Sequence, residues 1–118
     1  MSQTKPENQI DYIELPATDI PRTKAFYEQV FGWKFEDYGP HYTSFVDGSL
    51  SGGFTTDSGK PRNGVLIVLY SSDLRGVQTK IEKAGGKVVK PVFSFPGGQR
   101  FHFTDPCGNE LAVWSDAA

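Results

Sequence analysis

Two side chains in this sequence could move a proton near neutral pH, namely Glu14 and His102. Imidazole titrates close to neutral pH, so His102 could serve as a general base, as a hydrogen-bond partner or as a lone metal ligand. Glu14 lies in a stretch typical of a buried strand, where a carboxylate must reach water, pair with a cation or work as an acid or base. We predict both as catalytic residues, against the alternatives of a packed histidine and a solvated carboxylate.

Five further side chains are suited to hold a small molecule. Tyr12 and Trp114 could stack on a planar ligand, and Arg100 could grip a carboxylate or a phosphate. We expect Thr43 and Phe45 beside them. The alternatives are core aromatic residues and a solvated arginine at a strand end. The sequence therefore predicts an aromatic pocket with a few polar groups.

The elements that position these residues follow from a repeat with an offset of 54 residues, which carries Thr18-Asp19-Ile20 onto Ser72-Asp73-Leu74. Each of these tripeptides can cap the start of a helix, and Gly32 and the pair Gly85-Gly86 can end the two helices. The repeated unit is a strand, a helix and three strands. The predicted modules cover residues 8–56 and 64–115 of a single domain, with a linker at residues 57–63.

Alternating apolar and polar residues predict the strands. We place them at residues 8–15, 33–36, 41–46, 51–55, 65–70, 87–92, 100–104 and 110–114. We interpret Gly52-Gly53 as turn and bulge glycines. The fold class is therefore α+β, with two tandem βαβββ modules. Each four-stranded sheet carries one helix on one face, so we expect the two uncovered faces to curve into a shared trough that holds the ligand.

The length of the loop at residues 105–109 decides which side chains face that trough. A loop of five residues pairs His102 with Ala112 and turns Arg100, His102 and Trp114 toward the trough. A loop of four residues would exchange His102 for its neighbours Phe101 and Phe103. In the first module, the same alternation predicts four side chains on the trough side: Tyr12, Glu14, Thr43 and Phe45.

Composition excludes several classes of function. The 12 basic and 14 acidic residues give the 118-residue chain a net charge of −2, scattered along its length, so we expect no nucleic-acid partner. No apolar stretch approaches the roughly 20 residues of a membrane span, and we expect no membrane association. The start of the chain lacks the pattern of a secretion signal, so we expect a cytoplasmic protein. The single Cys107 excludes an internal disulfide and a site of several thiolates.

Two segments resemble the signature regions of the vicinal oxygen chelate superfamily, which includes glyoxalase I, the bleomycin-binding resistance proteins and the extradiol dioxygenases. They are TDIPRTKAFYEQVFGW at residues 18–33 and FTDPCGNELAVW at residues 103–114. The resemblance covers nearly the whole chain, and Ser51-Gly52-Gly53-Phe54 is similar to the branch related to lactoylglutathione lyase. It implies the paired βαβββ fold and, from relatives of this length, a homodimer.

The resemblance also implies one divalent metal, held by a His or Gln on the first strand and a Glu on the last strand of each module. The corresponding positions here are Tyr12, Ile67 or Leu66, Gly53 or Phe54, and Ala112. None offers an imidazole or a carboxylate. We therefore predict a protein that binds a small organic molecule with no metal and no cofactor. Two alternatives are a metal-dependent lyase or dioxygenase with a displaced site, and a metal-free acid–base enzyme using Glu14 or His102.

Overall fold

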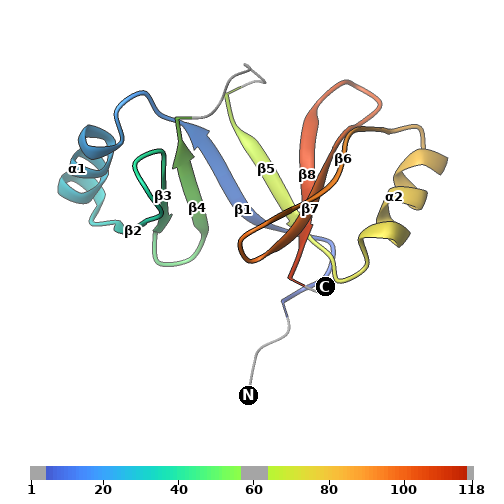
Figure 1. Ribbon diagram of the computed structural model, residues 1–118, viewed down its shortest axis with the longest axis horizontal. Helices are drawn as coiled ribbons and strands as arrows, with labels where there is room; N and C mark the ends of the chain where they lie inside the picture. The colour runs from blue at the N-terminus through green and yellow to red at the C-terminus, as the bar shows by residue number, and fades with distance from the viewer. Residues whose placement is uncertain (1–4, 57–63, 117–118) are drawn as a thin grey trace. The chain divides into compact units, whose positions relative to one another are not determined.

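The computed structural model describes residues 5–56 and 64–116 of the chain (Figure 1). The predicted linker at residues 57–63 lies outside them. The chain divides into two compact units, which are treated separately below. The first unit is Tyr12–Leu66, and the second joins Met1–Asp11 to Ile67–Ala118. In the described part of the chain, neither helix is long and apolar enough to cross a membrane.

The first unit contains one helix and the strands of the first module, in the sheet order β2-β3-β4-β1. Strand β1 is parallel to β4, and the other neighbours are antiparallel. The ring of Tyr27 on α1 stacks on Trp33 at 4.6 Å and on Phe54 at 5.3 Å, so aromatic contacts hold the helix on one face of the sheet. The elements are β1 (Gln9–Pro16), α1 (Ile20–Phe31), β2 (Lys34–Asp37), β3 (Tyr42–Val46) and β4 (Ser51–Thr55).

Local sequence signals fix both ends of α1. The Asp19 carboxylate accepts a hydrogen bond from the backbone N–H of Arg22 at 3.1 Å, and Pro21 lies in the first turn. Gly32 ends the helix with φ 75°, a left-handed conformation that glycine adopts without steric cost. The predicted capping residues of α1 are confirmed.

The second unit has the sheet order β5-β8-β7-β6, with β5 parallel to β8. Its helix is capped by Asp73, which accepts from the backbone N–H of Gly76 at 3.0 Å. Leu74 of this helix packs with Phe101 and Val113 in a core cluster, so the helix covers one face of the sheet. The elements are β5 (Leu66–Tyr70), α2 (Leu74–Lys83), β6 (Lys87–Phe95), β7 (Gly98–Thr104) and β8 (Glu110–Ser115).

The interpretation of Gly52-Gly53 as turn and bulge residues is wrong, because both lie inside β4. The pair has a packing role instead. A Cβ on Gly52 would collide with the Ile13 carbonyl oxygen and the Phe45 ring, whereas a Cβ on Gly53 would collide with the Tyr42 hydroxyl on the other face. Side chains from neighbouring strands thus lie directly over both glycines.

Gly52→Ala should lower the free energy of unfolding by about 1–3 kcal/mol, the usual cost of overpacking. Its new methyl group meets a fixed backbone oxygen as well as a ring. Gly53→Ala is the matched control and should cost less, because it meets the far ends of two tyrosine side chains that can move. Chemical denaturation of both variants measures the difference, and a Gly52→Ala variant as stable as the parent would contradict this packing.

Candidate functional site

The loop between β7 and β8 determines which side chains of the second unit point away from α2. The Asp105 carboxylate accepts hydrogen bonds from the Cys107 N–H at 2.8 Å, the Asn109 N–H at 3.0 Å and the Asn109 side-chain amide at 2.9 Å. These bonds, led by those of Asn109, lower the pKa of Asp105. Thr104 pairs with Glu110 across the loop, and His102 pairs with Ala112. Of the four- and five-residue loops that the sequence leaves open, the structure has the five-residue loop, which places His102 opposite Ala112.

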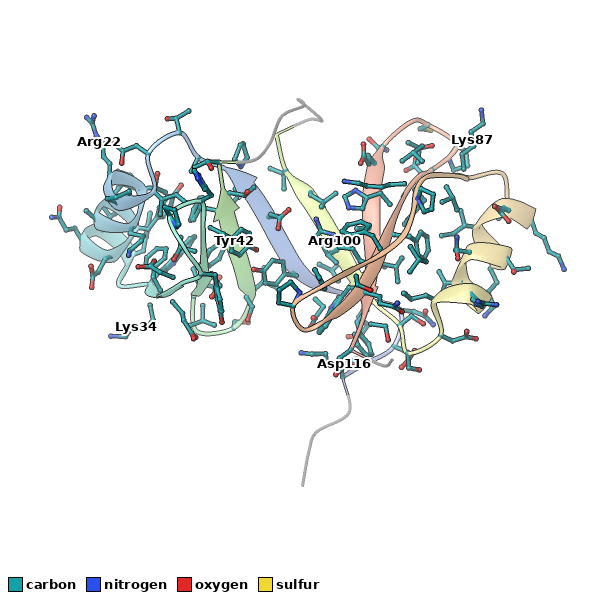
Figure 2. The ribbon with its side chains drawn as sticks, viewed as in Figure 1. Arg22, Lys34, Tyr42, Lys87, Arg100 and Asp116 are labelled. Atoms are coloured by element: carbon teal, nitrogen blue, oxygen red, sulfur yellow. The ribbon has the colours of Figure 1, made fainter. Side chains whose placement is uncertain are left out.

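This register gives the second unit a helix-free face, by which we mean the face of its sheet turned away from α2. Phe101 and Val113 pack on the helix, so the alternating residues Arg100, His102 and Trp114 lie on the helix-free face. Aromatic rings from β6 join them there. The Arg100 guanidinium lies 5.5 Å from the ring centre of Phe93 and 5.8 Å from that of Phe95 (Arg100 is labelled in Figure 2).

A ligand on this face would meet the ring of Trp114 and not its N–H group, because Nε1 already donates to the Asp11 carboxylate at 2.9 Å. Tyr70 makes an edge contact with the Trp114 ring at 5.4 Å, and Phe95 lies 6.2 Å from it. The Tyr70 hydroxyl donates to Asp116 at 2.6 Å, which raises the pKa of Tyr70 to about 12. This part of the helix-free face is therefore aromatic, with its polar atoms already bonded.

His102 is the polar group at the centre of this face. Only 1% of its surface is exposed, and its Nδ1 lies 2.9 Å from the Glu110 carboxylate. Burial lowers the pKa of His102, with Arg100 and Lys90 acting in the same direction and Glu110 opposing them. The buried Nε2 makes no hydrogen bond within the described residues. The sequence analysis missed Glu110, although its position two residues before Ala112 puts it on the face of His102.

In the first unit, the predicted Tyr12 and Glu14 lie together on the helix-free face. Both contact a residue that the sequence analysis missed, Tyr42 (labelled in Figure 2). The Tyr42 hydroxyl donates to the Glu14 carboxylate at 3.1 Å and lies 2.5 Å from the Tyr12 hydroxyl. Burial, together with the Glu14 charge, raises the pKa of Tyr42. Because Tyr42 has one proton, Tyr12 must donate to it, which forms a chain from Tyr12 through Tyr42 to Glu14.

The prediction that Thr43 and Phe45 lie beside Tyr12 and Glu14 is wrong. Ser44, not its neighbours, is in register with Gly53 and through it with Glu14. Thr43 and Phe45 are buried on the helix side, where the Phe45 ring stacks on Trp33 at 4.5 Å. The error is one residue of register, which moves every side chain of β3 to the opposite face.

The residues at the metal-ligand positions implied by the resemblance do not fit a divalent metal. Gly53 has no side chain, and the space beside it is taken by the Tyr12 and Tyr42 hydroxyls. Ala112 is fully buried and carries only a methyl group, and Ile67 is aliphatic. Among residues 5–56 and 64–116, no group of three or more His, Cys, Asp or Glu side chains could hold a metal ion.

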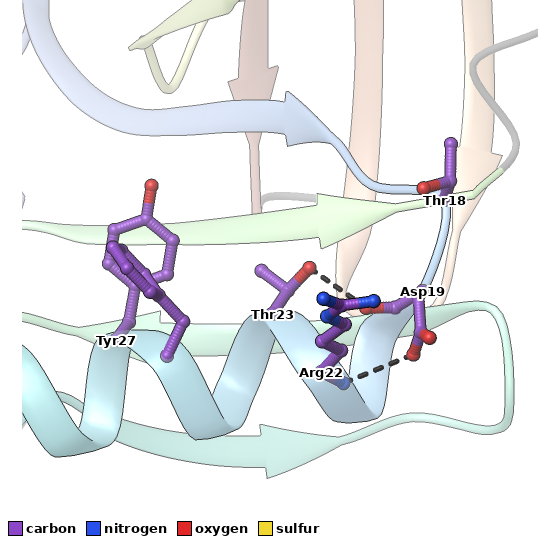
Figure 3. A pocket seen from close by; sticks show the side chains of 6 residues that line it. Thr18, Asp19, Arg22, Thr23 and Tyr27 are labelled. Carbon is purple, nitrogen blue, oxygen red and sulfur yellow. Dashed lines mark hydrogen bonds between the residues drawn. The ribbon is translucent and has the colours of Figure 1, made fainter.

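A hollow of about 520 Å³ lies along α1, and none of the predicted site residues lines it. Figure 3 shows its lining and two hydrogen bonds to Asp19: the Arg22 N–H donates to the Asp19 carboxylate, and the Thr23 hydroxyl donates to the Asp19 carbonyl oxygen. These polar groups cap the helix, so we assign the hollow no ligand. Its lining residues are Thr18, Asp19, Arg22, Thr23, Phe26 and Tyr27.

Comparison with known proteins supports the fold. A sequence profile of the Glyoxalase/Bleomycin resistance protein/Dioxygenase superfamily matches residues 9–113. A glyoxylase-like domain-containing protein of Didymella fabae is 32% identical, covering 89% of this chain and 91% of its own. A putative glyoxylase of Mycobacterium bovis is 26% identical over 88% of this chain, which spans only 44% of that relative.

Among solved structures, the Mn(II)-bound glyoxalase of Novosphingobium aromaticivorans superposes with a TM-score of 0.68 at 23% identity. The match covers 95% of this chain and 40% of that glyoxalase. At this identity the likeness shows the fold alone, and it confirms the predicted α+β fold class with two βαβββ modules. The shared trough depends on how the two units are placed, and it stays a prediction.

The pKa of His102 should lie below its ordinary value of 6.5, because burial penalises the imidazolium form. As the pH falls below about 6.5, the unfolded chain takes up a proton that folded His102 does not, so the free energy of unfolding should decrease with falling pH. Titration of the imidazole signals by NMR measures this pKa. The chain has only 2 histidines, so His41→Gln assigns the signals, and a His102 pKa at or above 6.5 would contradict the prediction.

Proposed function

Because this chain belongs to the glyoxalase/bleomycin resistance protein/dioxygenase superfamily, we propose that it binds a small organic molecule against its helix-free faces, without the metal that the resemblance implies. The observation that carries the proposal is His102, a buried imidazole whose Nε2 has no hydrogen-bond partner in the described part of the chain. Buried polar atoms are nearly always paired, so we infer that this nitrogen bonds a partner that the described residues do not include, and a bound molecule is such a partner.

The surroundings of His102 indicate the kind of molecule. The rings of Phe93, Phe95 and Trp114 supply flat apolar surface, and Arg100 supplies a cation beside them. Such a surface favours a planar or amphipathic molecule with at least one polar group. In the first unit, Tyr12, Tyr42 and Glu14 offer hydroxyl and carboxylate oxygens to a ligand on that face.

A second candidate function is a metal-free acid–base enzyme. It is favoured by the contact of each predicted catalytic residue with a second titratable group, Tyr42 for Glu14 and Glu110 for His102. Such pairs hold a base or an acid in one orientation. A metal-dependent lyase or dioxygenase with a displaced site has less support, since His102 and Glu14 do not belong to any group of three metal-binding side chains in the described residues.

A cytoplasmic location and a homodimer stay predictions. The cytoplasmic location agrees with the single cysteine, Cys107, which is exposed and free in the structure, since cysteines stay reduced in the cytoplasm. The second is a matter for sedimentation, which would separate a dimer from a monomer at micromolar concentration.

Binding can be mapped with two planar probes that each carry a hydrogen-bond donor, 2-naphthamide and 2-naphthol, by backbone amide NMR of the full chain. The amides of β7 and β8 around His102 should shift most, because that face combines aromatic rings with a nitrogen that no described residue hydrogen-bonds. His102→Phe keeps a flat ring and removes Nε2, and it should weaken the shifts. Shifts confined to the hollow along α1, or no saturable shift with either probe, would overturn the proposal.

Zn²⁺ and Ni²⁺ should not bind stoichiometrically, because the positions implied by the resemblance carry a phenol, a methyl group, an aliphatic chain and a glycine. Calorimetric titration of the purified chain, with elemental analysis before it, measures uptake. One ion per chain, lost on His102→Ala, would instead support the displaced metal site.

A further inference from the structure

Glu110 determines where the proton of His102 resides. The Glu110 Oε2 atom lies 2.9 Å from His102 Nδ1, and an ionised carboxylate can only accept a hydrogen bond. The Nδ1 atom must therefore carry the proton in this contact. A neutral imidazole has one N–H group, so Nε2 is left with a lone pair and acts as an acceptor.

Burial and nearby cations keep His102 in that neutral form. Desolvation disfavours the imidazolium, and the positive charges of Arg100 and Lys90 act in the same direction, which together lower the pKa of His102. Glu110 opposes them without reversing the direction. Around neutral pH, Nε2 is thus a buried acceptor and not a donor.

Among the described residues, the neighbours of His102 do not donate a hydrogen bond to Nε2. Ala112, opposite it on β8, has no polar side-chain atom, and Phe93 presents a ring at 5.9 Å. Lys90, its partner on β6, places its ammonium group over the Phe93 ring at 4.9 Å. Within the described residues Nε2 accepts no hydrogen bond, although a buried acceptor without one costs free energy. Because His102 is almost fully buried, a donor on a bound molecule can reach Nε2 only if neighbouring side chains such as Phe93 move aside.

We propose that His102 Nε2 is a specificity-determining acceptor, so that the helix-free face of the second unit selects planar molecules that donate an O–H or N–H hydrogen bond. Glu110 is its positioning residue, since it holds the proton on Nδ1. This inference deepens the proposed function and rests on it, because it specifies which polar group the bound molecule carries. A ligand of the same shape that can only accept would face a lone pair and bind weakly.

The proton position can be tested without a ligand. In protein labelled with ¹⁵N at histidine, long-range proton–nitrogen NMR at pH 7.5 should show His102 protonated at Nδ1 and bare at Nε2. His41→Gln removes the other histidine from the spectrum, and Glu110→Ala should shift His102 toward a mixture of the two tautomers. A His102 protonated at Nε2 in the parent chain would overturn the proposal.

The selectivity can be tested with a matched pair of probes, 2-naphthol and 2-methoxynaphthalene, which share a ring system but differ in the O–H donor. We expect 2-naphthol to bind at least tenfold more tightly to the parent chain by NMR titration, and His102→Phe to abolish the difference. Equal binding of the two probes by the parent chain would overturn this inference and leave the proposed function standing. Failure of both probes to bind would overturn the proposed function with it.

Discussion

The hydrogen bonds that Asp105 accepts within a five-residue loop fix the arrangement on which the candidate site depends. They set the loop length, the loop length sets the pairing of β7 with β8, and the pairing sends His102 to one face and Phe101 to the other. A loop one residue shorter would bury phenylalanines where His102 now lies and turn the imidazole toward α2. An exposed turn thus decides the chemistry of a buried face several residues away.

The first unit shows the same dependence of a site on backbone detail. Two adjacent glycines in β4 allow large side chains to cross the strand on both of its faces, Phe45 on the helix side and Tyr42 on the other. The Tyr42 hydroxyl can then reach both Tyr12 and Glu14. Glycine weakens a strand interior, so the pair is best explained by the space it provides. The space beside Gly52 and Gly53 therefore allows both the packing of Phe45 on the helix side and the polar cluster around Tyr42 on the other side.

The two units differ in how the polar groups on their helix-free faces are bonded. In the first unit, the hydroxyls of Tyr12 and Tyr42 and the carboxylate of Glu14 are bonded to one another. In the second unit, the described residues bond His102 at Nδ1 and leave its buried Nε2 without a hydrogen bond. A network in which every polar group is hydrogen-bonded makes a fold more rigid. A buried polar atom without a hydrogen bond costs free energy, and a ligand that bonds it removes that cost. This contrast is why we centre the proposed function on the second unit.

The sequence by itself determined what depends on neighbours along the chain. The helix caps at Asp19 and Asp73, the order of the strands and the repeat follow from local patterns and were predicted. For the loop that places His102, the sequence left two lengths open, and the structure has the longer one. Only the tertiary structure decided the face of β3, the roles of Glu110 and Tyr42, and the use of Gly52 and Gly53. Strand register is set by pairing between distant segments, and one residue of slip inverts a face. Alternation along a single strand therefore fixes which residues share a side, but not which side meets the helix.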